Sequence, residues 1–262
     1  MKINHISISR ESTWLECEQK YKYKYHLDML PEEEAPHFFY GKIVHKIIEN
    51  YTLGRGLIDI NDVTNSVLSG NIKLEEHSLP GRLNLPFQYR TKLPKHLAAF
   101  MRLINQIGTE GEVEWDFKFD LDSPNQKCYV GFIDRILRRG DKLDKVFIID
   151  YKTTKAGMWR KTRSNIGKDL QLQSYARVIQ REWGIPAENI KAALYYLDDP
   201  VELISTGFSQ ESLDSVEKRL LKAYKDIESK HPDNVIGSTG EHCFRCDYQS
   251  VCPFFNSYKN YE

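Results

Sequence analysis

Two short apolar runs between Gly131 and Thr154, joined by a charged turn, constrain the fold of this chain more than any other stretch. β-branched and aromatic runs bounded by a Gly/Asp cluster predict a β-hairpin, here with strands at 127–137 and 145–151. A carboxylate falls inside the first run, at Asp134, and another closes the second, at Asp150. A carboxylate at such a place is costly unless it is paired or holds a cation, so both positions call for a partner.

Lys152 follows Asp150 by two residues, and residues two apart in a strand point to the same face. Two carboxylates and an ammonium near one point suit a divalent cation bound to phosphate. The alternative is an ordinary Asp–Lys ion pair at a sheet edge, and the pair by itself does not decide between these two interpretations.

Charge and hydropathy set limits on the class of protein. The 262 residues are 40% hydrophobic, enough for one sizeable core or two small ones, and 37 basic side chains balance 37 acidic ones. With a net charge of zero, any surface for nucleic acid must be a local patch. No apolar run reaches membrane-spanning length and the N-terminus lacks a signal-peptide apolar region, so we expect a soluble, cytoplasmic protein without membrane contact.

The remaining periodicity predicts an alternation of helices and strands. We expect a helix within 1–28, capped by Ser9, and further helices and strands that are listed here: helices at 37–51, 61–68, 93–107, 164–183 and 209–230, and strands at 112–121, 190–197 and 201–208. Residues 112–121 and 127–137 should pair across a turn at 123–126. Glu112 or Glu114 of that first strand could reach the carboxylate site, although strand glutamates are more often exposed. One α/β domain over 1–262, with a helical insertion at 52–110, is the simplest architecture.

Three of the five cysteines crowd the C-terminal tail, 231–262, in the pattern C-x2-C-x5-C, and Cys17 lies far upstream. In a reducing compartment this clustering indicates metal binding rather than disulfides. Cys128 lies in a predicted strand, where we expect it to pack, and we expect His242 not to act as a ligand.

Four short motifs occur in a fixed order along the chain. They are G-x-x-x-H (Gly41, His45), G-x-x-D-R (Gly131, Asp134, Arg135), D-Y-K-T (Asp150, Lys152) and Q-x-x-x-Y (Gln171, Tyr175). In this order they resemble the PD-(D/E)XK nuclease superfamily, specifically its RecB-type branch. The cysteine frame resembles that of the iron–sulfur members, including the CRISPR-associated adaptation exonucleases and AddB-type nuclease domains. The resemblance covers 1–50 and 112–255.

The resemblance implies a restriction-endonuclease-like core, with a central mixed sheet flanked by helices, and a metal centre. Carboxylates of Asp134 and Asp150, with the carbonyl of Tyr151, would hold Mg²⁺ or Mn²⁺. The family's helix histidine carries over to His45, and an imidazole ligand favours manganese. Lys152 would orient the nucleophile. The resemblance also implies that Gln171 and Tyr175 hold the attacking water or the phosphate backbone.

For the thiols, the resemblance implies a 4Fe–4S cluster on Cys17, Cys243, Cys246 and Cys252, which would staple the tail to the first helix. Zinc is the alternative, but structural zinc sites usually use two C-x2-C-like pairs, whereas clusters accept scattered thiolates.

We therefore expect a DNA exonuclease acting on single-stranded ends and leaving 5′-phosphates, in recombination, repair or CRISPR adaptation. The alternative is a DNA-binding subunit of a larger recombination or CRISPR-adaptation complex with little activity of its own. A purely structural iron–sulfur protein would leave the four motifs unexplained.

Overall fold

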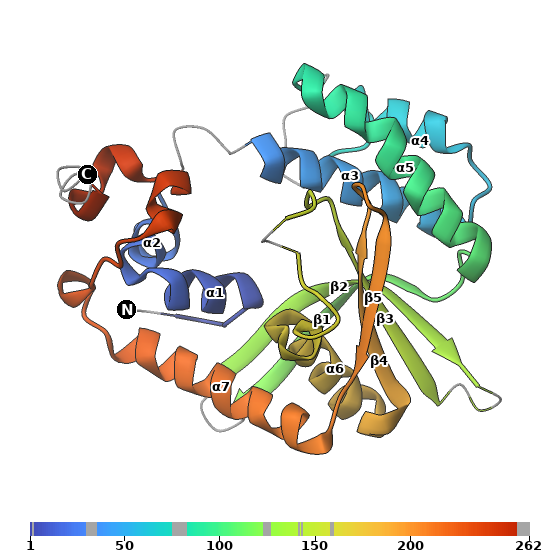
Figure 1. Ribbon diagram of the computed structural model, residues 1–262. Helices are drawn as coiled ribbons and strands as arrows, with labels where there is room; N and C mark the ends of the chain where they lie inside the picture. Colours follow the sequence, from blue (N-terminus) through green and yellow to red (C-terminus); the bar gives the residue numbers. More distant parts are fainter. Residues whose placement is uncertain are drawn as a thin grey trace. The chain divides into compact units, whose positions relative to one another are not determined.

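The computed structural model describes residues 1–255 except 2, 30–35, 75–82, 123–126, 141, 143, 158 and 159. Its strands form one five-stranded mixed sheet in the order β1-β2-β3-β4-β5 (Figure 1). They are β1 (Glu112–Asp122), β2 (Lys127–Arg139), β3 (Lys145–Lys152), β4 (Ile190–Tyr196) and β5 (Glu202–Gly207). The α/β class and the central mixed sheet flanked by helices are confirmed, whereas the turn expected at 123–126 lies outside the described residues.

Strand pairing brings together the segments that carry the predicted site. β2 and β3 are antiparallel, with a register that starts at Arg135 opposite Ile149. β3 and β4 are parallel, and the chain crosses between them through α6 (Leu170–Trp183), because parallel neighbours need a long connection. β4 and β5 close the sheet as an antiparallel pair.

The chain divides into two compact units. One comprises Met1–Ala35, Phe117–Gly131 and Asp214–Glu262, and the other comprises Pro36–Asp116 and Phe132–Leu213. The boundaries fall within β1, β2 and α7 (Gln210–Ser229). The residues of the four motifs from His45 to Tyr175 belong to the second unit, apart from Gly131, and the five cysteines belong to the first.

The core of the second unit lies between three helices and one face of the sheet. The helices are α3 (Pro36–Leu53), α4 (Ile60–Leu68) and α5 (Phe87–Ile107), so both helices of the stretch 52–110 contribute to this core. Ile43 and Ile47 of α3 are fully buried with Phe100 of α5. On β3, Ile149 and Tyr151 join this cluster. The alternate residues of β3 therefore point to the opposite face of the sheet.

The first unit contains α1 (Ile8–Glu16), α2 (Glu18–Tyr21) and most of α7. Ser7, and not the predicted Ser9, caps α1: its backbone is extended and its hydroxyl accepts a hydrogen bond from the Arg10 N–H at 3.3 Å. Cys17 separates α1 from α2 with an extended backbone, which ends the first helix, and its thiol is buried. In the described part of the chain, no helix is both long and apolar enough to cross a bilayer.

Candidate active site

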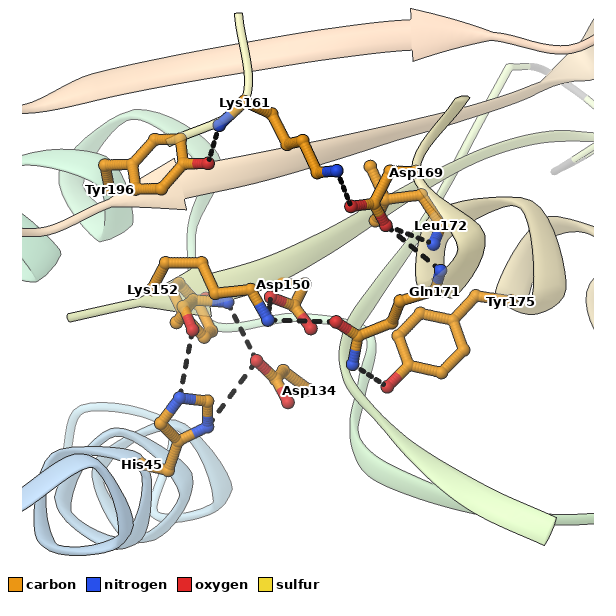
Figure 2. Close-up of polar contacts among 11 residues, drawn as sticks. His45, Asp134, Asp150, Lys152, Lys161, Asp169, Gln171, Leu172, Tyr175 and Tyr196 are labelled. Carbon is orange, nitrogen blue, oxygen red and sulfur yellow. Dashed lines mark hydrogen bonds and ion pairs between the residues drawn. The ribbon is translucent and has the colours of Figure 1, made fainter. Parts of the chain in front are cut away.

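The pairing of β2 with β3 stops beside the first predicted carboxylate. Beyond the Arg135–Ile149 pair, a side chain replaces the ladder: Oδ2 of Asp134 accepts the backbone N–H of Tyr151 at 2.8 Å. The two strands thus part at the residues that the sequence singled out. This parting opens the end of the sheet and keeps Asp134 anchored to β3 (Figure 2).

Asp150 and Lys152 project together from β3, as their spacing predicts. Nζ of Lys152 lies 2.6 Å from Oδ2 of Asp150 and donates a hydrogen bond to Oε1 of Gln171 at 2.9 Å. Gln171 then donates through Nε2 to the hydroxyl of Tyr175 at 2.8 Å (Figure 2). The helix motif and the strand motif therefore form one continuous chain of polar contacts.

A capped helix start fixes the position of Gln171. The Asp169 carboxylate accepts from the backbone N–H groups of Gln171 and Leu172, at 3.1 and 3.0 Å, which satisfies two free donors of the first turn of α6. Lys161 pairs with the same carboxylate at 3.9 Å, and its own backbone N–H donates to the Tyr196 hydroxyl at 2.8 Å (Figure 2). These contacts hold the start of α6 close to the end of β4, where Tyr196 is the register partner of Lys152 on β3.

His45 reaches this point from α3, more than a hundred residues upstream. Its Nε2 donates to the backbone carbonyl of Tyr151 at 3.0 Å, and its Nδ1 lies 3.5 Å from Oδ2 of Asp134. The apolar face of α3, buried in the core, turns His45 toward the open end of β2 and β3. The structure thus brings together the imidazole, the Asp134 carboxylate and the Tyr151 carbonyl, as expected from the motifs.

Glu114 completes a group of possible metal ligands. Ligand atoms of His45, Glu114 and Asp134 all lie within 4.8 Å of one another, and no other such group of three occurs among the described residues. The position of Glu114 in the predicted strand allows it to reach the site, but it is not one of the predicted metal ligands. Its backbone has φ of +44°, a conformation rare for a side chain of this kind, and the sequence around it carries no signal for that bend.

The start of β1 is clamped to β2 just before Glu114. Arg135, fully buried, donates to the carbonyls of Gly108 and Glu110. Gly111 has φ of +108°, and a side chain there would collide with the carbonyl oxygen of Ile136. This close approach fixes where β1 begins and hence where Glu114 points.

Charges in the site influence one another strongly. Burial opposes the charged form of His45, but Asp134, Asp150 and Glu114 overcome it and raise its pKa to about 9. Burial also opposes ionisation of Asp134, yet the neighbouring His45 and Lys152, with the Tyr151 N–H, lower the pKa of that carboxyl.

The other two carboxyls respond in the opposite direction. Burial raises the pKa of Asp150 to about 6 despite the attraction of Lys152. Burial, reinforced by the charge of Asp134, raises the pKa of Glu114 to about 7. Both carboxyls lie near Asp134, and a bound cation would favour their ionised forms.

The donor set fits a divalent cation. Oδ2 of Asp150 is buried without a well-aligned hydrogen bond, although the Lys152 ammonium is near it. Carboxylate and carbonyl oxygens suit Mg²⁺ or Mn²⁺, and the imidazole of His45 suits Mn²⁺ better. A cavity of about 1060 Å³ opens onto the site and is lined by His45, Glu114 and Lys152, so a ligand has access to these groups.

The four predicted cluster cysteines also come together, in the other unit. Cys17, Cys243, Cys246 and Cys252 line one small cavity of about 20 Å³, and all are free thiols. Among the described residues no three of them lie mutually within 4.8 Å, whereas thiolates around one zinc ion would be about 3.8 Å apart. Cys128 is buried elsewhere, 3.7 Å from the carbonyl of Asn4. His242 lines the cavity, with Nε2 3.7 Å from the Cys243 sulfur.

The chain is similar in sequence and in fold to known proteins. Residues 5–253 match the family model described as the PD-(D/E)XK nuclease superfamily. A crystal structure of a Eubacterium rectale protein, described as a "putative exonuclease", matches with a TM-score of 0.56 and 12% identity, covering 97% of this chain and 88% of that one. At this identity the match shows a shared fold. The crystal structure of SSO0001 matches at 17% identity with a TM-score of 0.40, and the match covers 90% of this chain and 94% of that one. No curated protein matches the sequence.

Proposed function

Because the chain belongs to the PD-(D/E)XK nuclease superfamily, we propose that it is a metal-dependent DNA exonuclease that acts on single-stranded ends. One observation carries the proposal: His45, Asp134 and Lys152, from three separate elements, meet with Asp150 at the open end of the sheet. His45 and Lys152, together with Glu114, line a cavity of about 1060 Å³, which a purely structural ion-pair network would not require.

Mg²⁺ or Mn²⁺ would be held by His45, Asp134, Asp150 and the carbonyl of Tyr151, with Glu114 as a further ligand. Such an ion supplies an activated water at neutral pH and polarises the phosphoryl oxygen. The branch of the superfamily that uses a helix histidine is the RecB-type branch, which we also assign to this chain.

Three side chains would act on the phosphate and the water. The Lys152 ammonium, held between Asp150 and Gln171, can donate to the attacking water or to an oxygen of the phosphorane, where charge builds. Gln171 fixes the direction of that ammonium, and Tyr175 fixes Gln171. The product would carry a 5′-phosphate.

In the other unit we infer a structural 4Fe–4S cluster on Cys17, Cys243, Cys246 and Cys252. The four thiols face one cavity but stand too far apart for a single ion, which supports a larger group over zinc. Such a cluster would join the break after α1 to the C-terminal tail. Recombination, repair or CRISPR adaptation is the kind of process we assign to the nuclease.

The test of the nuclease is digestion of end-labelled single- and double-stranded DNA with Mg²⁺ or Mn²⁺. We expect shortening of single strands from an end by the native protein, and a loss of at least 100-fold in Asp150→Ala and Lys152→Ala. Both variants should keep the native circular dichroism spectrum. Cleavage retained in both variants would overturn the assignment, whereas tight DNA binding without cleavage by the native protein would favour the DNA-binding subunit.

A further inference from the structure

Two phenyl rings that the catalytic role does not use are exposed in the active-site cavity. Phe38 and Phe132 each retain 57% of their accessible surface, and both line the cavity that contains His45 and Glu114. Single exposed phenylalanines are ordinary on a protein surface. Two in the cavity that also contains candidate metal ligands indicate a flat apolar ligand.

The spacing of each ring from its neighbouring metal ligand is set by secondary structure. Phe132 precedes Asp134 by two residues on β2, so both project from the same face about 7 Å apart. Phe38 precedes His45 by seven residues on α3, which places it two turns away on the same face, about 10 Å along the axis. The two rings therefore lie at different distances from the metal site.

Glycine keeps the helix face open between the ring and the histidine. Gly41 lies one turn after Phe38 and one turn before His45, and it lines the same cavity. A methyl group at Gly41 would meet only Thr153 Oγ1, at 3.8 Å. The face from Phe38 to His45 is thus a shallow track along which an extended chain can lie.

The charge of the cavity wall is complementary to a polyanion. Five lysines and two glutamates line it, although the whole chain is neutral. Lys42 and Lys155 are exposed at this wall, and Lys42 is one turn beyond Phe38. Basic side chains that follow a phosphate backbone beside aromatic rings that stack on bases are the arrangement by which proteins bind single strands.

We propose that Phe38 and Phe132 form two base-stacking positions for unpaired nucleotides near the scissile phosphate. The ligand is a single-stranded nucleic acid, because in a duplex the faces of the bases are covered by the neighbouring base pairs and cannot stack on such rings. This proposal rests on the proposed function for the position of the cleaved phosphate, and it supplies the physical reason for a preference for single strands. Each ring should contribute on the order of 10-fold to single-strand affinity.

The test is fluorescence of 2-aminopurine placed at successive positions near the end of a single-stranded oligonucleotide, titrated with protein in EDTA. We expect quenching at two positions with the native protein, lost at one position in Phe38→Ala and at the other in Phe132→Ala. Phe132→Trp should restore quenching at its position. Phe87→Ala removes a ring that is 75% exposed but outside the cavity lining, and should change nothing.

An abasic substitution separates stacking from a general loss of binding. If the ring stacks on a base, Phe132→Ala weakens binding to the intact oligonucleotide about 10-fold but has no effect once that base is removed. The proposal would be overturned if both alanine variants bound the intact strand with the affinity of the native protein and left the 2-aminopurine emission as the native protein does. Because binding is measured in EDTA, base stacking and cleavage succeed or fail independently: ring-dependent quenching without Mn²⁺-dependent cleavage leaves the stacking positions standing while the nuclease assignment fails.

Discussion

Nζ of Lys152 lies 2.9 Å from Oε1 of Gln171, which ties the end of β3 to the first turn of α6. This hydrogen bond restricts the direction in which the Lys152 ammonium can point. The Lys152 ammonium is also 2.6 Å from Asp150, so its position is determined from two sides. The direction of the ammonium therefore depends in part on Gln171, which is not among the proposed metal ligands.

Removing the Gln171 amide should lower the rate of cleavage without lowering metal affinity. In Gln171→Ala we expect kcat to fall by roughly 10- to 100-fold, as when groups that orient catalytic residues are removed. Titration with Mn²⁺ should give the native dissociation constant, because Gln171 is not a ligand. Gln180→Ala, which removes an amide of the same helix that bonds Gln210, is the matched control and should retain native kcat.

Manganese binding at pH 8 should release close to one proton. The pKa of His45 is raised to about 9, so the free imidazole is still protonated at pH 8, whereas Glu114 and Asp150, at about 7 and 6, are already ionised. A ligand imidazole must lose its proton, so affinity should rise with pH up to about 9, by about 10-fold per unit. Calorimetry in buffers of different ionisation enthalpy counts the proton. Proton release that persists in His45→Asn would contradict the prediction that His45 is the source of the proton.

The thiol-lined cavity should hold iron and sulfide in protein purified without oxygen. We expect a brown protein, and bleaching with lowered thermal stability in Cys246→Ser, because one ligand of the cluster is lost. Cys128→Ser is the control and should keep the colour, since that thiol is buried away from the cavity. A colourless protein with one zinc per chain would show that the alternative is correct.

Glu11 should be essential for the stability of its unit. It is fully buried on α1, and its carboxylate lies 2.7 Å from Nε of Arg219 on α7. Removing a fully buried carboxylate that pairs with an arginine is strongly destabilising, so Glu11→Ala should cost about 3–5 kcal/mol. Urea unfolding measures the loss. Glu16→Ala removes a partly exposed carboxylate of the same helix that pairs with Lys20, and should cost about 0.5 kcal/mol or less. Equal effects of the two substitutions would contradict the prediction.

Local periodicity in the sequence predicted contacts between residues of the same strand or the same helix. The two-residue spacing of Asp150 and Lys152 gave an ion pair, and the four-residue spacing of Gln171 and Tyr175 gave a hydrogen bond. Both spacings depend only on strand and helix geometry, which the backbone imposes wherever the element lies. The sequence does not identify Ser7 as the cap of α1 because Ser7 and Ser9, two residues apart, offer the same hydroxyl, and the extended backbone at Ser7 decides between them.

The amino-acid sequence by itself determined the strands and helices, the faces that their polar residues share and the order of the four motifs. Only the tertiary structure decided that Glu114 joins His45 and Asp134 and that Phe38 and Phe132 open into one cavity. The reason is physical. A repeat of two or 3.6 residues is a property of the local backbone, whereas these meetings depend on how buried surfaces pack over long separations and on a bend at Glu114 that no local pattern encodes.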